Sequence, residues 1–203
     1  KILNSSLDKA LDILNYYNAD RQVIGLSELA RLSGIPKATV YRMISTLEVH
    51  GFINKVNIIG RDNQYKLGLR FLEYGKLVSD SLEVRKIALS YMAKLRDTVN
   101  ECVQLIVRDN DEAMYIEKLE CNQFIRLYTR TGRRAPLYGG ACPRAILTFL
   151  PDDEIDRILD SVDLVKYTVN TVVDKNKLKK MIGQYRKLWR TEARNCCYRS
   201  TDI

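Results

Sequence analysis

Two short helical patterns stand close together in the chain, and the segment Gly34-Ile35-Pro36 lies where the first gives way to the second. Ser27, Glu28 and the apolar residues after them predict a helix that stops at Gly34, since glycine accepts the left-handed conformation of a helix end. Pro36 suits the first position of a second helix, where its missing N–H costs nothing. Two short helices joined by so tight a turn are typical of a helix-turn-helix.

The second helix has one apolar stripe and several polar positions. Val40, Ile44 and Leu47 recur every three or four residues, which predicts that they are buried. In a helix-turn-helix the N-terminal side chains of the second helix face base edges. The candidate DNA contacts here are Lys37, Ala38, Thr39, Tyr41, Arg42 and Ser45, together with Ser27 from the first helix. The alternative is that these residues form an ordinary solvated helix face.

A hairpin is predicted directly after the second helix. Phe52 begins one strand, residues 60–63 form a turn sequence, and the alternation of Tyr65, Leu67 and Leu69 predicts the returning strand. A hairpin in this place is the wing of a winged helix-turn-helix. Its basic residues are expected to meet phosphates or the minor groove, and they are Lys55, Arg61 and Lys66.

Basic residues are concentrated in this same stretch. Residues 36–70 carry six basic groups against Glu48 and Asp62, a net charge of +4, whereas residues 1–35 are neutral. The remaining +4 of the total charge of +8 is spread over all later residues. A local concentration of positive charge supports contact with nucleic acid better than a modest total net charge does.

An amphipathic helix over 7–17, capped by Ser6, is expected before the helix-turn-helix.

The rest of the chain predicts a mixed, α+β domain. Leucines at helical spacing predict helices over 68–81 and 84–99, and the pattern changes to alternation after Asn100. We expect strands over 102–107, 113–119 and 124–129, a loop over 132–140, and helices over 145–150, 152–162 and 175–189. Helices outside an antiparallel sheet are typical of a sensor-like α+β domain.

The quoted motifs together resemble one family. The run LSELARLSGIPKATVYRMISTLEVHGFI, followed by YKLG, resembles the N-terminal half of the IclR family of bacterial transcriptional regulators. The segments EVRKIALSYMAKLRDTVNECVQLIV, AMYIEKLE and TGRRAPLYGGACPRAILTFLP resemble its GAF-like effector domain. The resemblance implies a winged helix-turn-helix DNA-binding domain over 1–67, a linker helix over 68–81 that helps dimerisation, and an effector-binding domain over 82–203.

The resemblance also implies an effector site in the second domain. A small molecule, often a carboxylate or an aromatic acid, would lie between the sheet and the loop before a helix, lined by Leu127, Thr129, Ala135, Ala141 and Cys142. A helix that starts near Pro143 would offer free N–H groups to an anion, with Arg144 close by. The family usually has Gly-Lys at these two positions, and Pro143 removes one donor.

The segment after Trp189 does not follow the family pattern. The family continues with a Gly-Tyr-Ala segment and several strands, whereas residues 190–203 read RTEARNCCYRSTDI. A shortened chain, an altered reading frame or missing segments would each explain the difference. We expect an effector domain incomplete at its C-terminus, with weakened ligand binding.

These features predict a cytoplasmic transcriptional regulator, a repressor, that binds a palindromic operator in double-stranded DNA as a homodimer or tetramer. A small organic-acid or aromatic effector would modulate binding, with no cofactor, no metal and no membrane contact. An enzyme is the alternative, but His50 is the only histidine, placed at a helix end, and no nucleophile–base set or phosphate loop is present. A third possibility is an effector domain that serves only for oligomerisation.

The cysteines give no motif of their own. Five are present, an odd number without a CxxC pair, so neither a zinc site nor a disulfide framework is predicted and the thiols are expected to be reduced. Cys142 stands at an expected helix start, where a lowered thiol pKa would allow a redox role, but a packed or ligand-facing side chain is the preferred interpretation.

Overall fold

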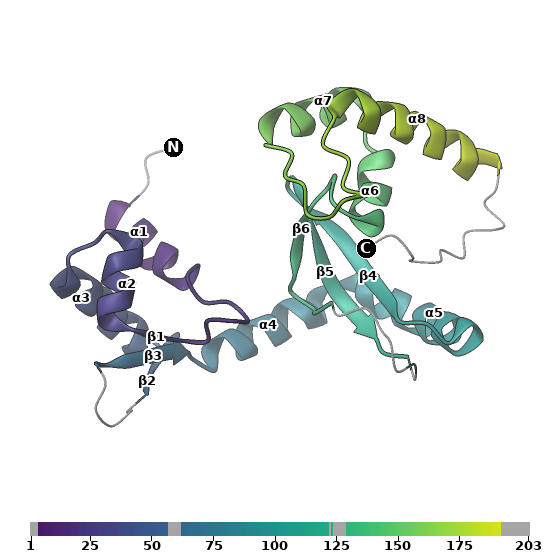
Figure 1. Cartoon of the computed structure of the whole chain (residues 1–203). Coiled ribbons are helices and arrows are strands. Elements are labelled where there is room, and N and C mark those ends of the chain that lie inside the picture. The colour runs from purple at the N-terminus through teal and green to yellow at the C-terminus, as the bar shows by residue number, and fades with distance from the viewer. Residues whose placement is uncertain (1–3, 57–61, 122, 124–128, 192–203) are drawn as a thin grey trace. The chain divides into compact units, whose positions relative to one another are not determined.

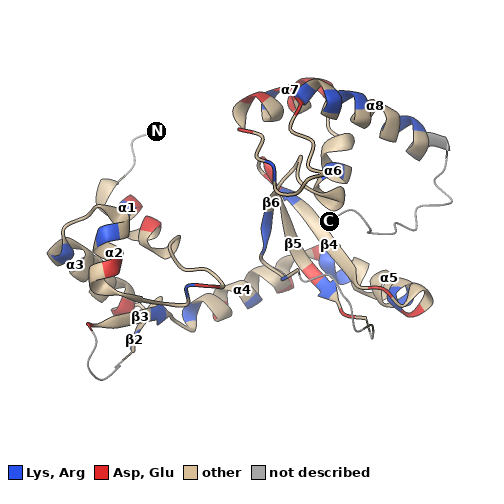
Figure 2. Ribbon diagram, in the orientation of Figure 1, with Lys and Arg blue, Asp and Glu red and all other residues tan. Residues whose placement is uncertain are grey.

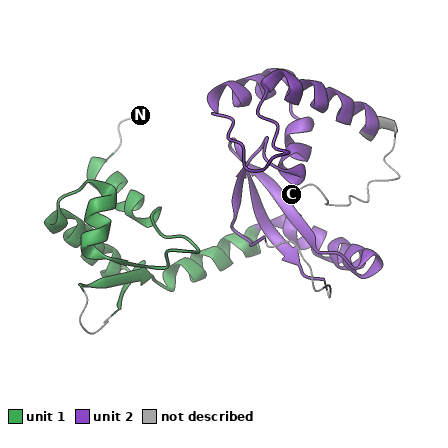
Figure 3. Ribbon diagram, in the orientation of Figure 1, with its two compact units in different colours: residues 1–81 green, residues 82–203 purple. Residues whose placement is uncertain are grey.

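The computed structural model describes residues 4–56, 62–121, 123 and 129–191 (Figure 1). The chain divides into two compact units, residues 1–81 and residues 82–203 (Figure 3). The first unit combines helices with a small sheet, and the second combines a larger sheet with helices. Each unit is described by itself.

Helix α1 (Ser5–Leu14) opens the first unit. Its N-cap is Asn4, whose side-chain oxygen accepts hydrogen bonds from the backbone N–H groups of Ser6 and Leu7, both at 3.1 Å. An N-cap side chain of this kind satisfies donors that the first helical turn leaves free. The prediction that Ser6 caps this helix is therefore wrong, because Ser6 already lies inside it. The helix also ends three residues earlier than residue 17, where the apolar spacing predicted its end.

Helices α2 (Leu26–Ser33) and α3 (Lys37–Val49) form the helix-turn-helix. Gly34 follows α2 with a φ of +66°, the left-handed conformation that glycine adopts without strain, so the predicted glycine stop is confirmed. Pro36 has a ψ of 135° and is the N-cap of α3, one position before the predicted one. Its carbonyl oxygen accepts the first hydrogen bonds of the helix, from the N–H groups of Thr39 and Val40.

Strands β1 (Val23–Gly25), β2 (Ile53–Val56) and β3 (Gln64–Leu67) form an antiparallel sheet in the order β1-β3-β2. The β2–β3 pair is the predicted wing hairpin. Strand β1 was not predicted, because three residues are too few to show alternation. Strand β3 ends at Leu67, and Leu69 lies beyond it. Gly68 is needed there, since a Cβ atom on it would lie 2.0 Å from the carbonyl oxygen of Gly51.

One hydrophobic core joins the helices and strands of the first unit. Its buried members come from α1, α2, α3 and all three strands, and they include Ile13, Ile24, Leu29, Val40, Ile44, Ile53 and Tyr65. Full burial of such a side chain contributes about 1.5–3 kcal/mol. The predicted burial of Val40 and Ile44 is confirmed, and Leu47 packs against the same core while partly exposed. This packing fixes the orientation of α3 within the unit.

Helix α4 (Arg70–Ser81) ends the first unit, and within the described residues it buries none of its side chains. Leu72 is 72% exposed, and Leu77 and Val78 are 63% and 61% exposed. Apolar residues at helical spacing on a solvated helix are typical of a surface that another element covers.

The second unit begins with helix α5 (Glu83–Val99), which ends at Asn100 in a left-handed conformation. Strands β4 (Val103–Asp109), β5 (Glu112–Leu119) and β6 (Arg134–Pro136) then form an antiparallel sheet in the order β4-β5-β6. Strand β6 lies within the predicted loop 132–140, so that prediction is wrong for these three residues, which pair with β5 through Ala113 and Ala135. Of the strand predicted over 124–129, residues 124–128 lie outside the described residues and Thr129 is not in a strand.

Three helices complete the second unit: α6 (Ala141–Thr148), α7 (Asp152–Ser161) and α8 (Lys175–Thr191). Their buried residues form a core with Ala113 of β5, and it includes Leu137, Leu147, Ile158, Leu159 and Leu178. Helix α6 starts four residues before the prediction. An antiparallel sheet flanked by helices confirms the predicted α+β class.

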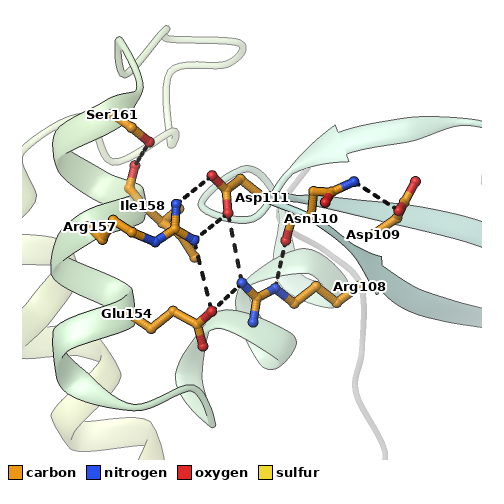
Figure 4. A network of polar contacts seen from close by, with 8 residues as sticks. All are labelled: Arg108, Asp109, Asn110, Asp111, Glu154, Arg157, Ile158 and Ser161. Atoms are coloured by element: carbon orange, nitrogen blue, oxygen red, sulfur yellow. Dashed lines mark hydrogen bonds and ion pairs between the residues drawn. The ribbon is translucent and has the colours of Figure 1, made fainter. Parts of the chain in front are cut away.

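A network of four charged side chains ties α7 to the β4–β5 turn (Figure 4). Arg157 of α7 donates two hydrogen bonds to the Asp111 carboxylate, at 2.8 and 2.6 Å. Arg108 of β4 donates to Glu154 of α7 at 2.6 Å and to the backbone oxygen of Asn110 at the same distance. Two arginines thus alternate with two carboxylates, which holds the turn against the helix.

Candidate nucleic-acid interface and effector site

Helix α3 presents the predicted contact residues to solvent. Lys37, Ala38, Tyr41 and Arg42 are exposed, and Thr39 and Ser45 are partly exposed. Val40 and Ile44 are fully buried on the opposite side. The core therefore fixes which side of the helix is free. An exposed tyrosine, 49% accessible, beside an arginine and a lysine supplies both apolar surface and hydrogen-bond donors.

A carboxylate from the wing lies at the N-terminal end of α2 and contacts the side chain of the first residue of α3. Asp62 accepts hydrogen bonds from the Ser27 hydroxyl and from the Ser27 backbone N–H, the latter at 3.1 Å. The Lys37 ammonium donates to the Ser27 hydroxyl at 2.7 Å and to Asp62 at 3.2 Å. Hydrogen bonds from Ser27 and Lys37 lower the pKa of Asp62 to about 2. The residue pair predicted to touch DNA thus forms an anion-binding position that already holds a carboxylate.

Asp62 was missed as a functional residue, because in the sequence it counts only as one acidic residue of the turn. The one sign of such a role in the sequence was an acidic residue in the wing, directly after a helix that carries Lys37 and Arg42. The structure brings it against Ser27, which lies 35 residues earlier.

The wing places its described basic residues on two neighbouring strands. Lys55 of β2 and Lys66 of β3 are both exposed, and their register partners are Tyr65 and Asn54. Arg61, the third predicted contact, lies outside the described residues. Figure 2 shows basic positions on the helices and on β3 of the first unit, with acidic positions interspersed. The described basic groups are distributed on separate elements, as expected for contacts with several phosphates.

The structure describes four of the five predicted effector residues, and they differ in exposure. Thr129 and Ala135 are buried, 6% and 8% exposed, Ala141 is partly exposed and Cys142 is exposed. Leu127 lies outside the described residues. The Gln104 side-chain amide of β4 donates a hydrogen bond to the Thr129 hydroxyl, and its Oε1 atom is buried without a partner among the described residues. A buried acceptor of this kind is available to a donor on a ligand.

The N-terminus of α6 differs from the prediction. Gly140, with a φ of +88°, is the N-cap, so Cys142 and Pro143 both lie inside the first turn. The Arg144 side chain donates to the Gly140 carbonyl oxygen at 3.2 Å. Although Cys142 keeps solvent-accessible surface, partial desolvation of its thiol by neighbouring protein atoms raises the pKa and outweighs the backbone hydrogen bond that favours the thiolate. The direction is the opposite of the lowered pKa considered from the sequence.

Other kinds of site were sought in the described part of the chain. A pocket of about 400 Å³ lies among residues 166–177, and it is bordered by none of the predicted effector residues that the structure describes. Among the described residues no group of three or more His, Cys, Asp or Glu side chains could hold a metal ion. Within the same residues, no helix has the length and apolar character required to cross a membrane.

Comparison with known proteins covers both units. Residues 6–56 match the IclR helix-turn-helix domain, and residues 76–192 match the C-terminal domain of the bacterial transcriptional regulator IclR. The HTH-type transcriptional regulator KipR of Bacillus subtilis is 45% identical over 175 residues, which are 86% of this chain and 68% of KipR.

Solved structures give the same result for the fold. The crystal structure of Thermotoga maritima IclR has 30% identity and a TM-score of 0.62, and the match covers 90% of this chain and 72% of that one. An IclR homologue from Microbacterium hydrocarbonoxydans, solved in complex with 4-hydroxybenzoate, has 23% identity and a TM-score of 0.73, with 92% and 74% covered.

Proposed function

The chain belongs to the IclR family of bacterial transcriptional regulators, and we propose that it represses transcription by binding a palindromic operator. The observation that carries the proposal is the exposed side of α3, with Lys37, Tyr41 and Arg42 opposite the buried Val40 and Ile44. In the proposed complex α3 lies in the major groove. Arg42 reads a base edge there, because a guanidinium matches the acceptors of guanine.

Residues 1–67 are proposed as the DNA-binding domain, 68–81 as the linker helix and 82–203 as the effector domain. The residues proposed to contact phosphates or the minor groove are Ser27, Lys37, Lys55, Arg61 and Lys66. Those proposed to face base edges all lie on α3 and are Ala38, Thr39, Tyr41, Arg42 and Ser45. The exposed leucines of α4 support assembly through this helix into a homodimer or tetramer. Two-fold assembly explains why a palindrome is expected. We place the protein in the cytoplasm, where the DNA of a bacterium lies.

The proposed effector is a small aromatic or organic acid in the second unit. The site would include Leu127, Thr129, Ala135, Ala141 and Cys142, and Gln104 joins them through its hydrogen bond to Thr129. The binding of 4-hydroxybenzoate by the Microbacterium homologue supports this chemical class. Effector binding would shift the population of arrangements that fit DNA.

The experiment is a footprint on DNA that flanks the gene of this protein. We expect two protected half-sites about one helical turn apart, or a multiple of it. Affinity should decrease strongly when Arg42 is changed to Ala. Uniform binding to all sequences at 150 mM salt, a concentration at which non-specific binding to DNA is already weakened, would contradict an operator-reading function.

Two alternatives for the second unit have their own test. A melting-temperature screen with 4-hydroxybenzoate and small carboxylates distinguishes an effector domain from one that serves only for oligomerisation, because a ligand that binds the native state raises the melting temperature. Catalytic activity is a separate alternative. Incubating the protein with the ligands that bind, and analysing the products, tests it directly.

A further inference from the structure

Two cysteines that are far apart in the sequence meet in the second unit. Cys102 immediately precedes β4 and Cys121 follows β5 by two residues. Their Sγ atoms lie 2.9 Å apart, and the Cys121 backbone N–H donates to the Cys102 Sγ atom at 3.4 Å. A disulfide bond has an S–S length of about 2.05 Å, so a displacement of roughly 1 Å separates the thiols from covalent bonding.

The sheet explains why these thiols meet. Strands β4 and β5 pair in antiparallel register, and Val103 opposite Leu119 is the last pair before the cysteines. Extending this register by one residue places Cys102 opposite Glu120, so Cys121 lies one residue beyond the position directly opposite Cys102. The two thiols therefore meet just past the open end of the hairpin, where the chain has left β5. Sequence spacing alone gave no sign of this.

The two thiols have different environments. Cys121 is 5% exposed, and Cys102 is partly exposed. Hydrogen bonds from the Cys102 thiol and from the Gln123 backbone N–H lower the pKa of Cys121, whereas desolvation raises the pKa of Cys102. Cys121 is therefore the more readily ionised of the two thiols, and Cys102 lies within reach to resolve a sulfenic acid formed on it.

We propose that Cys102 and Cys121 form a reversible disulfide when the protein meets a hydroperoxide. The Cys121 thiolate attacks one peroxide oxygen, the O–O bond breaks, and hydroxide or alkoxide leaves while the sulfur becomes a sulfenic acid. The Cys102 sulfur then attacks the Cys121 sulfur, the S–O bond breaks and the Cys102 proton leaves with the hydroxyl group as water. The two sulfurs are oxidised and the peroxide is reduced.

The disulfide bond would act directly on the β4-β5-β6 sheet of the second unit. It would close the β4–β5 hairpin at its open end, and β4 also carries Gln104, which holds Thr129. A cross-link of this kind stabilises a fold mainly by restricting the unfolded chain. The inference requires neither DNA nor an effector, so it stands or fails independently of the proposed function.

The test uses the full chain with Cys142, Cys196 and Cys197 changed to Ser, so that only the pair remains. Hydrogen peroxide is added, free thiols are then alkylated, and peptides are mapped by mass spectrometry without reduction. We expect a cross-linked peptide pair, lighter by two hydrogen atoms, with loss of both thiols together. Dithiothreitol should restore both thiols. The melting temperature should rise by roughly 5 °C on oxidation.

Single-cysteine variants keep the proposal falsifiable. With Cys102 also changed to Ser, oxidation should stop at a Cys121 sulfenic acid that dimedone traps, and the melting temperature should not rise. Peroxide that leaves both thiols alkylatable would overturn the proposal. So would sulfonic acid without a cross-link, or disulfides only between chains.

Discussion

The Lys37 ammonium of helix α3 lies 3.2 Å from the Asp62 carboxylate of the wing. The first residue of α3 is therefore bound to an acidic group on the surface that we propose for DNA. Both the Ser27 hydroxyl and its backbone N–H donate to the same carboxylate. A DNA phosphate would need these donors, so Asp62 and phosphate compete for one anion-binding position.

Changing Asp62 to Asn should strengthen DNA binding at low salt by about twofold to fivefold, the range expected for an exposed ion pair. The substitution removes a negative charge and frees Lys37 for phosphate. The measurement is a fluorescence-anisotropy titration with operator DNA. Asp8→Asn, the same charge change at an exposed position of α1, is the control and should have a smaller effect. Equal or weaker binding by Asp62→Asn would show that Asp62 orients the wing instead.

Changing Arg42 to Ala should weaken operator binding by about 1–3 kcal/mol, or roughly fivefold to 150-fold, because a base contact is lost. Binding to unrelated DNA should change less. The melting temperature should remain that of the unchanged protein, since Arg42 is exposed. Lys9→Ala on α1 removes the same charge and serves as control. Unchanged operator affinity in Arg42→Ala would remove Arg42 from the interface.

Changing Lys66 to Ala should reduce the slope of log K against log salt by about 0.9, the value for one lost phosphate contact. Binding should weaken similarly on all sequences, because a phosphate contact carries no base information. Arg61→Ala is expected to behave in the same way. A salt slope that stays at the value of the unchanged protein would indicate that this strand of the wing does not reach DNA.

The sequence predicted the first unit well because its signals are local. Gly34 stops α2 by its own backbone preference, and the spacing of Val40 and Ile44 identifies the buried side of α3. Asn4 was missed as a cap because Ser6 fits the same preference. The choice between them depends on where the helix begins, which propensity fixes only to within a few residues.

Features that depend on distant residues could not be predicted in this way. Strand β6 exists because Ala135 pairs with Ala113, and no alternation within three residues indicates it. Asp62 and the Cys102–Cys121 pair became visible only through packing of separate elements. The effector residues came from family resemblance, and all five of them stay predictions.

Changing Arg157 to Ala should lower the melting temperature by about 2 °C. Asp111 would lose two hydrogen bonds, and Arg108 would then be the remaining described cation close to it, at 3.7 Å. The effect should be small because the Arg157 side chain is 53% exposed. Calorimetry measures it, with Lys180→Ala on α8 as an exposed control. A decrease no larger than the control would mean that the Arg157–Asp111 pair does not help to hold α7.

The same network should make stability depend on acidity. Hydrogen bonds from Arg157 lower the pKa of Asp111, and hydrogen bonds from Arg108 lower the pKa of Glu154, below ordinary values of 3.8 and 4.5. A carboxylate with a lowered pKa binds fewer protons in the folded than in the unfolded state. Its contribution to stability is therefore complete above the ordinary pKa and is lost as pH falls through the pKa of the folded state.

Melting temperatures measured between pH 6 and pH 3 should decrease less steeply in Asp111→Asn than in the unchanged protein. Asp153→Asn, an exposed neighbour on α7, should keep the original steepness. Equal steepness in all three proteins would exclude Asp111 as a source of acid sensitivity.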